Sequence, residues 1–169
     1  MTINKTELLG FLEEVNKIIG KPVTLTAVGG TAMTLLDLKA STIDIDFDLS
    51  AEDVDIFRKA VKSLPPGHRI DIFTEGMIFS QQLPSDYLEK CIPVKTKFVN
   101  IRLLALHPAD IVVTKIGRMN ERDVEDIKSC VKKFKLVKKD VEKRALQVVY
   151  VGREENYRIN LRYALKEFF

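Results

Sequence analysis

The stretch STIDIDFDLS, residues 41–50, alternates three aspartates with three apolar residues. The aspartates are Asp44, Asp46 and Asp48. Successive side chains of an extended strand point to opposite faces, so the three carboxylates should share one face and the apolar groups the other. Carboxylates held this close make one another harder to ionise unless a positive charge lies opposite them. The pattern therefore predicts a strand over residues 42–48 with a cation beside its acidic face.

A divalent metal ion is one cation that suits these acids. Asp44 and Asp46 lie two residues apart, which separates their Cα atoms by roughly 6.5 Å on an extended strand. Carboxylates are ligands that Mg²⁺ prefers, and paired metal ions stabilise the attacking and leaving oxygens of a phosphoryl displacement. A third ligand is available from HRIDIF, residues 68–73, where Asp71 lies between two isoleucines. The alternative is that Asp71 is an ordinary exposed residue paired with Arg69.

A glycine pair follows the first predicted strand, residues 23–28. Gly29 and Gly30 precede Thr31, and the residues after them favour a short helix. Backbone N–H groups at such a turn can bind a phosphate, with the Thr31 hydroxyl as a further donor. The alternative is that the glycines only supply a turn that requires positive φ.

Helices and strands alternate in the first two thirds of the chain. The predicted elements are a helix over 2–19, a strand over 23–28, a short helix over 31–38, a strand over 42–48, a helix capped by Ser50, a strand over 68–73 and two strands within 87–106. After residue 107 the apolar spacing is helical, with four helices before the C-terminus. We therefore predict an α+β (α/β) fold, with a mixed β-sheet flanked by helices over residues 1–106. A helical C-terminal region, residues 107–169, is expected to pack on this core.

Length and composition indicate a globular protein of one domain, because 169 residues can bury a sizeable core. No run approaches the ~20 apolar residues of a membrane span, and the N-terminus lacks the features of a secretory signal. We therefore expect a cytoplasmic protein without membrane contact. Cys91 and Cys130 have no metal-ligand spacing, so reduced thiols are expected rather than a zinc site or a disulfide framework.

Charge is distributed unevenly along the chain, although the net charge is only +3. Residues 1–114 hold 12 Lys/Arg against 15 Asp/Glu, whereas residues 115–144 hold 11 against 6. The basic stretch 128–144 favours contact with RNA or tRNA through its phosphates. A solvated, lysine-rich helical surface is the alternative.

The sequence resembles the nucleotidyltransferase superfold of the DNA polymerase β-like enzymes. The hallmark of that superfold is a Gly-Gly or Gly-Ser turn, then Asp-x-Asp on a strand, then a later strand carboxylate, and VGGTAMTLL with STIDIDF matches it. The match is most similar to the minimal branch that includes the AbiEii-type toxins and related uncharacterised archaeal and bacterial proteins. Thr42 and Asp44 fall on the T-x-D-x-D positions of this branch, which favours Asp44 and Asp46 as the acidic pair. Asp48 is then expected past the strand end, where it would cap the following turn.

A second stretch, HPADIVVTKIGRMNERDVEDI, is similar to the other signature of the same branch. The resemblance implies that Lys115 contacts nucleotide phosphates and that Asp123 or Asp126 helps to hold the site together. Structural alternatives exist for the acids: Asp123 can serve in a helix cap begun by Asn120, and Asp126 can pair with Arg122 along a helix.

The resemblance implies a metal-dependent nucleotidyltransferase that passes NMP from an NTP such as ATP to a hydroxyl of RNA, tRNA, a protein or a small molecule. Asp44, Asp46 and Asp71 would be the catalytic residues and the ligands of Mg²⁺ or Mn²⁺. Gly29, Gly30, Thr31 and Lys115 would bind the nucleotide. The alternative is an inactive nucleotide-binding protein, or one partner of a toxin–antitoxin pair, with the same fold. A nuclease is disfavoured because neither histidine is placed to activate water.

Overall fold

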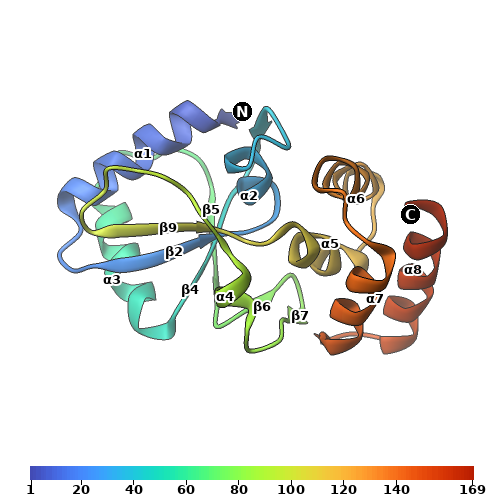
Figure 1. Cartoon of the computed structure of the whole chain (residues 1–169). Helices are drawn as coiled ribbons and strands as arrows, with labels where there is room; N and C mark the ends of the chain where they lie inside the picture. The colour runs from blue at the N-terminus through green and yellow to red at the C-terminus, as the bar shows by residue number, and fades with distance from the viewer. The chain divides into compact units, whose positions relative to one another are not determined.

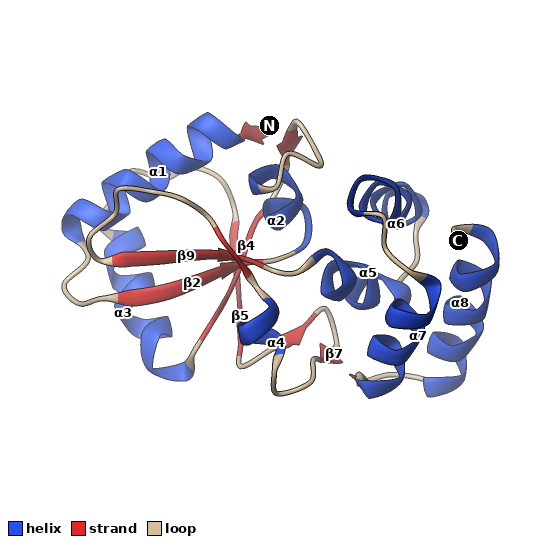
Figure 2. Cartoon of the chain, viewed as in Figure 1, coloured by secondary structure: helices blue, strands red, loops and turns tan.

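The computed structural model describes residues 1–169 and divides into two compact units. Unit 1 comprises Met1–Glu75 and Cys91–Ala105, and unit 2 comprises Gly76–Lys90 and Leu106–Phe169. The chain contains eight helices together with strands in both units (Figures 1 and 2). This mixed architecture confirms the predicted α+β class.

Unit 1 is built on a mixed sheet. Its strands are β2 Val23–Ala27, β4 Ile45–Leu49, β5 Ile70–Thr74, β8 Ile92–Pro93 and β9 Ile101–Ala105. Their order across the sheet is β5-β4-β2-β9-β8. Strand β4 pairs antiparallel with β2 and parallel with β5, while β9 runs parallel to β2 and antiparallel to β8. The start of β4 therefore lies beside the end of β2.

Three helices accompany this sheet: α1 Lys5–Ile18, α2 Gly29–Leu35 and α3 Ala51–Lys62. Helix α1 begins at a capping box, in which the Asn4 side chain accepts from the Glu7 amide and the Glu7 carboxylate accepts from the Asn4 amide, at 2.9 Å each. Helix α3 begins at Ser50, whose hydroxyl accepts from the Asp53 amide, as predicted. The Asp53 carboxylate instead accepts from the Thr24 amide at 3.1 Å, which ties α3 to β2.

The two faces of β4 differ in character. Ile45, Phe47 and Leu49 are buried on one face, where the Phe47 ring meets the Phe57 ring of α3 edge-on at 5.8 Å. Asp46 and Asp48 lie on the opposite face because side chains alternate along a strand. The expected separation of acids from apolar groups is therefore present within β4.

The predicted strand over residues 42–48 is wrong at its start and correct from Ile45 onward. Thr42 belongs to a short antiparallel ribbon, β1 Ile3–Asn4 with β3 Ser41–Thr42, and the chain bends before β4 begins. Ile43 lies in this bend with 47% of its surface exposed, so it does not share the apolar face. The expectation that Asp48 lies past the strand end is also wrong, because Asp48 is only 1% exposed and lies inside β4. The pairing of Thr42 with Ile3 separates Thr42 from β4, and the alternation of residue types along residues 42–48 does not indicate this pairing.

Two strands were predicted within residues 87–106. The second is present as β9, but most of the first is not a strand. Tyr87–Lys90 forms a short helix, α4, which follows a turn closed by the Tyr87 amide on the Pro84 carbonyl. Only Ile92–Pro93 is a strand in this segment. Pro93 lies on the edge strand, where its missing N–H costs no ladder bond, as expected.

Unit 2 contains the four predicted C-terminal helices. They are α5 Pro108–Ile116, α6 Glu121–Phe134, α7 Lys138–Gln147 and α8 Glu154–Glu167. Three short strands, β6 Met77–Ile78, β7 Gln81–Gln82 and β10 Val149–Tyr150, pair antiparallel in the order β6-β7-β10. Helix α5 is almost entirely buried and contacts α6, α7 and α8. From α8, the Asn160 amide donates to the Ile116 carbonyl at 2.8 Å and so caps the end of α5.

Cys91 and Cys130 are both buried and form no disulfide, as expected. None of the helices combines the length and apolar composition that a membrane span requires.

Candidate functional site

The acidic residues gather where β4 and β5 begin. These strands are parallel neighbours, and their register pairs Asp46 directly with Asp71. Paired residues on adjacent strands lie about 4.8 Å apart and point to the same side of the sheet. Asp44 lies two residues before Asp46, in the bend that leads into β4. The third carboxylate expected from a neighbouring strand is thus beside the first pair.

The positive charge beside these acids is Arg69. Its guanidinium Nε lies 3.1 Å from Asp71 Oδ1, and both side chains reach solvent, with 73% and 32% of their surfaces exposed. Asp71 raises the pKa of Arg69 most, and the charges of Asp44 and Asp46 raise the pKa further. One guanidinium therefore lies within the field of all three carboxylates. The alternative pairing of Asp71 with Arg69 is present as a contact, but in an exposed position.

Two threonine hydroxyls hold the backbone of the acidic stretch. Thr31 Oγ1 donates to the Asp44 carbonyl at 3.2 Å and accepts from the Asp46 amide at 2.9 Å. Thr42 Oγ1 donates to the same Asp44 carbonyl at 3.0 Å. The hydroxyl of Thr31 is fully buried and its proton is committed to this carbonyl. Sequence reasoning named Thr31 only as a phosphate donor, and the T-x-D-x-D spacing was the one signal for the role of Thr42.

The glycine pair is required by two different constraints. Gly29 has φ +52°, a left-handed conformation that other residues adopt only at a cost. At Gly30, an added Cβ would lie 2.6 Å from Thr42 Oγ1, well inside van der Waals contact. The glycine turn and the acidic stretch are therefore packed against each other, and Thr42 joins them.

Replacing Gly30 with alanine is expected to destabilise the protein by about 1–3 kcal/mol, because the new methyl group would displace Thr42 from the Asp44 carbonyl. The free energy of unfolding in urea measures the loss. Gly10 is a matched control, since it lies in α1 with open space around it. Gly10→Ala should be stabilising by about 0.5–1 kcal/mol. Equal effects at the two positions would contradict the packing described for Gly30.

The donor set suits a hard divalent cation. Asp46 and Asp71 are paired on adjacent strands and Asp44 lies in the bend before β4, and carboxylate oxygens are what Mg²⁺ and Mn²⁺ prefer. In the conformation of the structure, no three carboxylate, imidazole or thiol groups are gathered closely enough to enclose an ion. Asp71 is turned toward Arg69 instead. The residues therefore fit such an ion by chemistry and placement, and Arg69 is the group that competes for Asp71.

Lys115 lies in unit 2, in the last turn of α5. Its side chain is 4% exposed, and its Nζ lies 3.2 Å from Asp123 Oδ1 and 2.9 Å from Asp126 Oδ2. Asp123 also completes the predicted capping box with Asn120 and accepts from Arg118 Nε at 2.7 Å. The second signature of the sequence is thus one connected ion-pair network within unit 2.

Burial alone would raise the pKa of Asp123, but the hydrogen bonds and charges of Arg118 and Lys115 outweigh burial and lower the pKa. Asp123 therefore stays ionised in the folded protein at any pH near neutrality. Its contribution to stability is present above the ordinary aspartate pKa of about 3.9 and is lost as the pH falls through the lower pKa of the folded state.

His107 links the stability of α5 to pH. Its Nδ1 accepts from the Ala109 amide at 3.1 Å as the N-cap of α5, which requires an unprotonated Nδ1. Burial lowers the pKa of His107. The unfolded chain then takes up a proton first, so the free energy of unfolding should fall as the pH drops below about 6.5.

Urea unfolding between pH 8 and pH 5 measures this dependence. The variant His107→Asn keeps a capping side chain that does not titrate, so the fall below about pH 6.5 should be reduced in it. An unchanged pH profile in the variant would contradict the assignment to His107.

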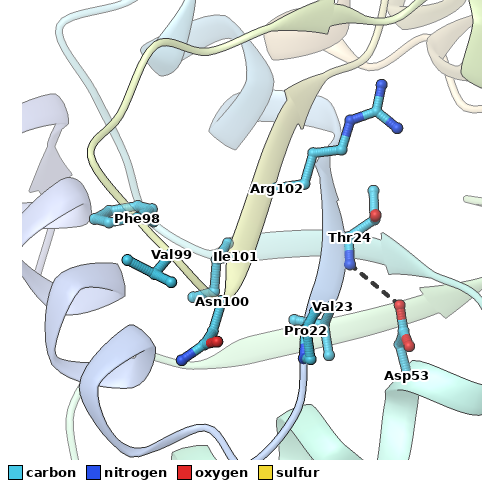
Figure 3. A pocket seen from close by; sticks show the side chains of 9 residues that line it. All are labelled: Pro22, Val23, Thr24, Asp53, Phe98, Val99, Asn100, Ile101 and Arg102. Atoms are coloured by element: carbon cyan, nitrogen blue, oxygen red, sulfur yellow. Dashed lines mark hydrogen bonds between the residues drawn. The ribbon is translucent and has the colours of Figure 1, made fainter.

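Three pockets open on unit 1, and they lie at different places from the acids. The pocket in Figure 3, of about 480 Å³, is lined by the starts of β2 and β9 and by the loop that precedes β9. Figure 3 shows Asp53 bonded to the Thr24 amide on one side, with Phe98 and Asn100 on the other. This is the opposite end of β2 from Gly29. A pocket of about 400 Å³ includes Ile45 and is lined mainly by apolar groups. The third, of about 520 Å³, lies between α1 and the loop before β9.

The comparison with protein families gives one match, which covers nearly the whole chain. Residues 6–168 match the family described as "Nucleotidyltransferase of unknown function (DUF6036)". The match includes the glycine turn, all three aspartates and the Lys115 network. No curated protein and no solved structure matches the sequence.

Proposed function

Because the chain belongs to this nucleotidyltransferase family, we propose that it transfers a nucleoside monophosphate from a nucleoside triphosphate to a hydroxyl group. The observation that supports the proposal is the in-register pairing of Asp46 with Asp71 on two adjacent strands, with Asp44 two residues before Asp46. A bond forms between the acceptor oxygen and the α-phosphorus, and the bond to the β-phosphate breaks to release pyrophosphate. Such a reaction depends mainly on positioning and on electrostatic stabilisation.

Asp44, Asp46 and Asp71 would hold Mg²⁺ or Mn²⁺. The ions, when bound, would neutralise charge on the phosphates and polarise the reacting oxygens. Asp71 is partly exposed, as Asp44 is, whereas Asp46 is buried, and Asp71 would accept the proton of the attacking hydroxyl. Arg69 would give up its contact with Asp71 when the site is loaded and stay near as a counter-charge.

Gly29, Gly30 and Thr31 would present backbone N–H groups to the β- and γ-phosphates. The first N–H groups of a helix lack intrahelical partners, and a glycine turn lets the phosphates approach closely. The Thr31 hydroxyl would act indirectly, through its hold on the backbone of Asp44 and Asp46. That Lys115 contacts the phosphates stays a prediction, and its ammonium group pairs with two carboxylates within unit 2.

On the T-x-D-x-D motif, we further propose that the chain is related to the minimal AbiEii-type branch, where a cognate toxin or antitoxin is a candidate partner. A second candidate function is nucleotide binding without turnover. The ion pair of Arg69 with Asp71 favours this second function, because it engages the carboxylate that would otherwise accept a proton.

A labelling experiment separates the two functions. The protein is incubated with each α-labelled NTP, with Mg²⁺ or Mn²⁺, and with total RNA or total protein as acceptor. Transfer of label to a macromolecule with release of pyrophosphate supports the transferase. Saturable binding of NTP without transfer to any acceptor supports the second function.

A further inference from the structure

The turn between α6 and α7 has an unusual concentration of positive charge. Residues 132–139 read KKFKLVKK, with five lysines and no acidic residue. All five lysine side chains are exposed. The excess of five positive charges in the segment 115–144 is therefore concentrated in this one turn of unit 2.

These lysines do little for the stability of unit 2. One exposed cation of α6, Lys128, is paired along its helix with Glu125 at 3.1 Å. Lys132, Lys135, Lys138 and Lys139, in contrast, take part in no ion pair. Lys138 and Lys139 begin α7, where the positive end of the helix dipole disfavours cations, and Val137 supplies no side-chain cap. Only Asp140 in the same turn of α7 offsets their charge, so a bound anion would stabilise this end of the helix.

The backbone of this turn is hydrogen-bonded to the end of α6, and apolar side chains are exposed between its lysines. Lys135 has φ +50°, and the Leu136 amide bonds back to the Val131 carbonyl at 3.1 Å, which closes the end of α6. Phe134 is 38% exposed and Val137 is 58% exposed. An exposed aromatic ring between lysines is a platform on which an unpaired base can stack.

We propose that this turn, residues 132–139, is a docking surface for single-stranded RNA. The inference names the acceptor class and so rests on the proposed function. Five cations in a turn that contains no acidic residue match a polyphosphate chain, and the exposed ring favours unpaired bases over a duplex, whose bases are already stacked. The loops and ends of RNA present such unpaired bases. A membrane surface fits less well, because the apolar face of α6 is turned inward at Ile127 and Cys130.

Fluorescence anisotropy with a labelled 20-nucleotide oligo-U tests the proposal, in EDTA and without NTP. The variant Lys132→Gln, Lys135→Gln, Lys138→Gln, Lys139→Gln should lose at least tenfold in affinity at low salt. The slope of log K against log salt should fall by about 3, since each phosphate contact to a single strand contributes about 0.7. The Tm of the variant should be unchanged or higher, because α7 loses two unfavourable charges.

A matched variant removes the same charge from unit 1. Lys21, Lys59, Lys95 and Lys97 are all exposed, and their replacement by Gln should leave RNA affinity within about twofold of wild type. Equal losses of affinity in the two variants would overturn the proposal. Binding that is tighter than binding to oligo-U would also overturn it, if seen with oligo-dT, with duplex RNA or with phosphatidylcholine vesicles that contain one third phosphatidylserine.

Failure of this inference can be told from failure of the proposed function. The variant Asp44→Asn with Asp46→Asn should bind oligo-U as tightly as wild type, because those residues lie in unit 1. RNA binding at residues 132–139 without any nucleotidyl transfer would overturn the proposed function and leave the RNA surface supported. Transfer to another acceptor with no RNA binding would overturn the RNA surface alone.

Discussion

Exchanging Asp44 and Asp46 together for asparagine is expected to slow nucleotidyl transfer at least about a thousandfold while the protein stays folded. The amides keep the shape of the side chains but cannot hold a divalent cation with the charge of a carboxylate. Asp46 is paired in register with Asp71, so the exchange leaves Asp71 as the one carboxylate of the three proposed ligands. The Tm should be unchanged or raised, because mutual repulsion between the acids is relieved. Single-turnover transfer of labelled NMP, together with thermal melting, measures both effects.

Asp48 and Asp55 serve as controls for this result. Asp48 lies on the same face of β4, two residues beyond Asp46, and is buried. Asp48→Asn should retain transfer at temperatures where the variant is folded, and the exposed Asp55→Asn should retain it throughout. Loss of transfer in Asp48→Asn, together with full transfer in Asp44→Asn alone, would move the acidic pair to Asp46 and Asp48. Unfolding of the double variant would show that Asp44 and Asp46 are structural.

Replacing Arg144 with methionine should have the largest effect on stability. Arg144 Nη2 donates to Asp110 Oδ2 at 2.9 Å, and Nη1 donates to Asp86 Oδ1 at 2.6 Å. Burial alone would lower the pKa of Arg144, but the bonds to Asp110 and Asp86 raise the pKa above its ordinary value. Methionine fills a similar volume and leaves Asp110, which is 0% exposed, as a buried charge without its partner.

Breaking a buried pair in this way costs roughly 3–5 kcal/mol. For a chain of this length the corresponding fall in Tm is about 10 °C. Urea unfolding gives the free energy directly, and Arg158→Met is the matched control. Arg158 pairs with Glu154 at 2.7 Å on the surface of α8, so its loss should cost less than about 1 kcal/mol. Similar losses in the two variants would mean that Asp110 is neutral or solvated.

Local chemistry was sufficient to predict most of the elements. The predicted caps Ser50 and Asn120 begin the helices expected of them, whereas the helix predicted over 2–19 begins only at Lys5. The failures have long-range causes. Residues 42–48 alternate as a strand should, but the pairing of Thr42 with Ile3 bends the chain before β4 starts.

In the candidate site, too, the features set by local spacing could be predicted and those set by long-range packing could not. The position of Asp71 on the strand after Asp46 was enough to predict that these two acids are neighbours, because their strands pair in register. Asp44 lies in the bend before β4, and no three acids are gathered closely enough to enclose an ion. The threonine contacts could not be predicted, since Thr31 and Asp46 are 15 residues apart and meet only when α2 packs beside β4. The same holds for Lys115, whose ion pairs depend on how α5 and α6 cross.

The path of the chain between its units has a consequence for biosynthesis. Unit 2 draws on residues 76–90 and then on residues 106–169, with the last strands of unit 1 made in between. No single cut can therefore yield both units intact, and a fragment that begins at residue 106 would lack Asp86, a partner of Arg144. On the ribosome, unit 1 stays incomplete until β9 has emerged. The segment with β6, β7 and α4 is made earlier, but it can pack into unit 2 only after the later helices have been synthesised.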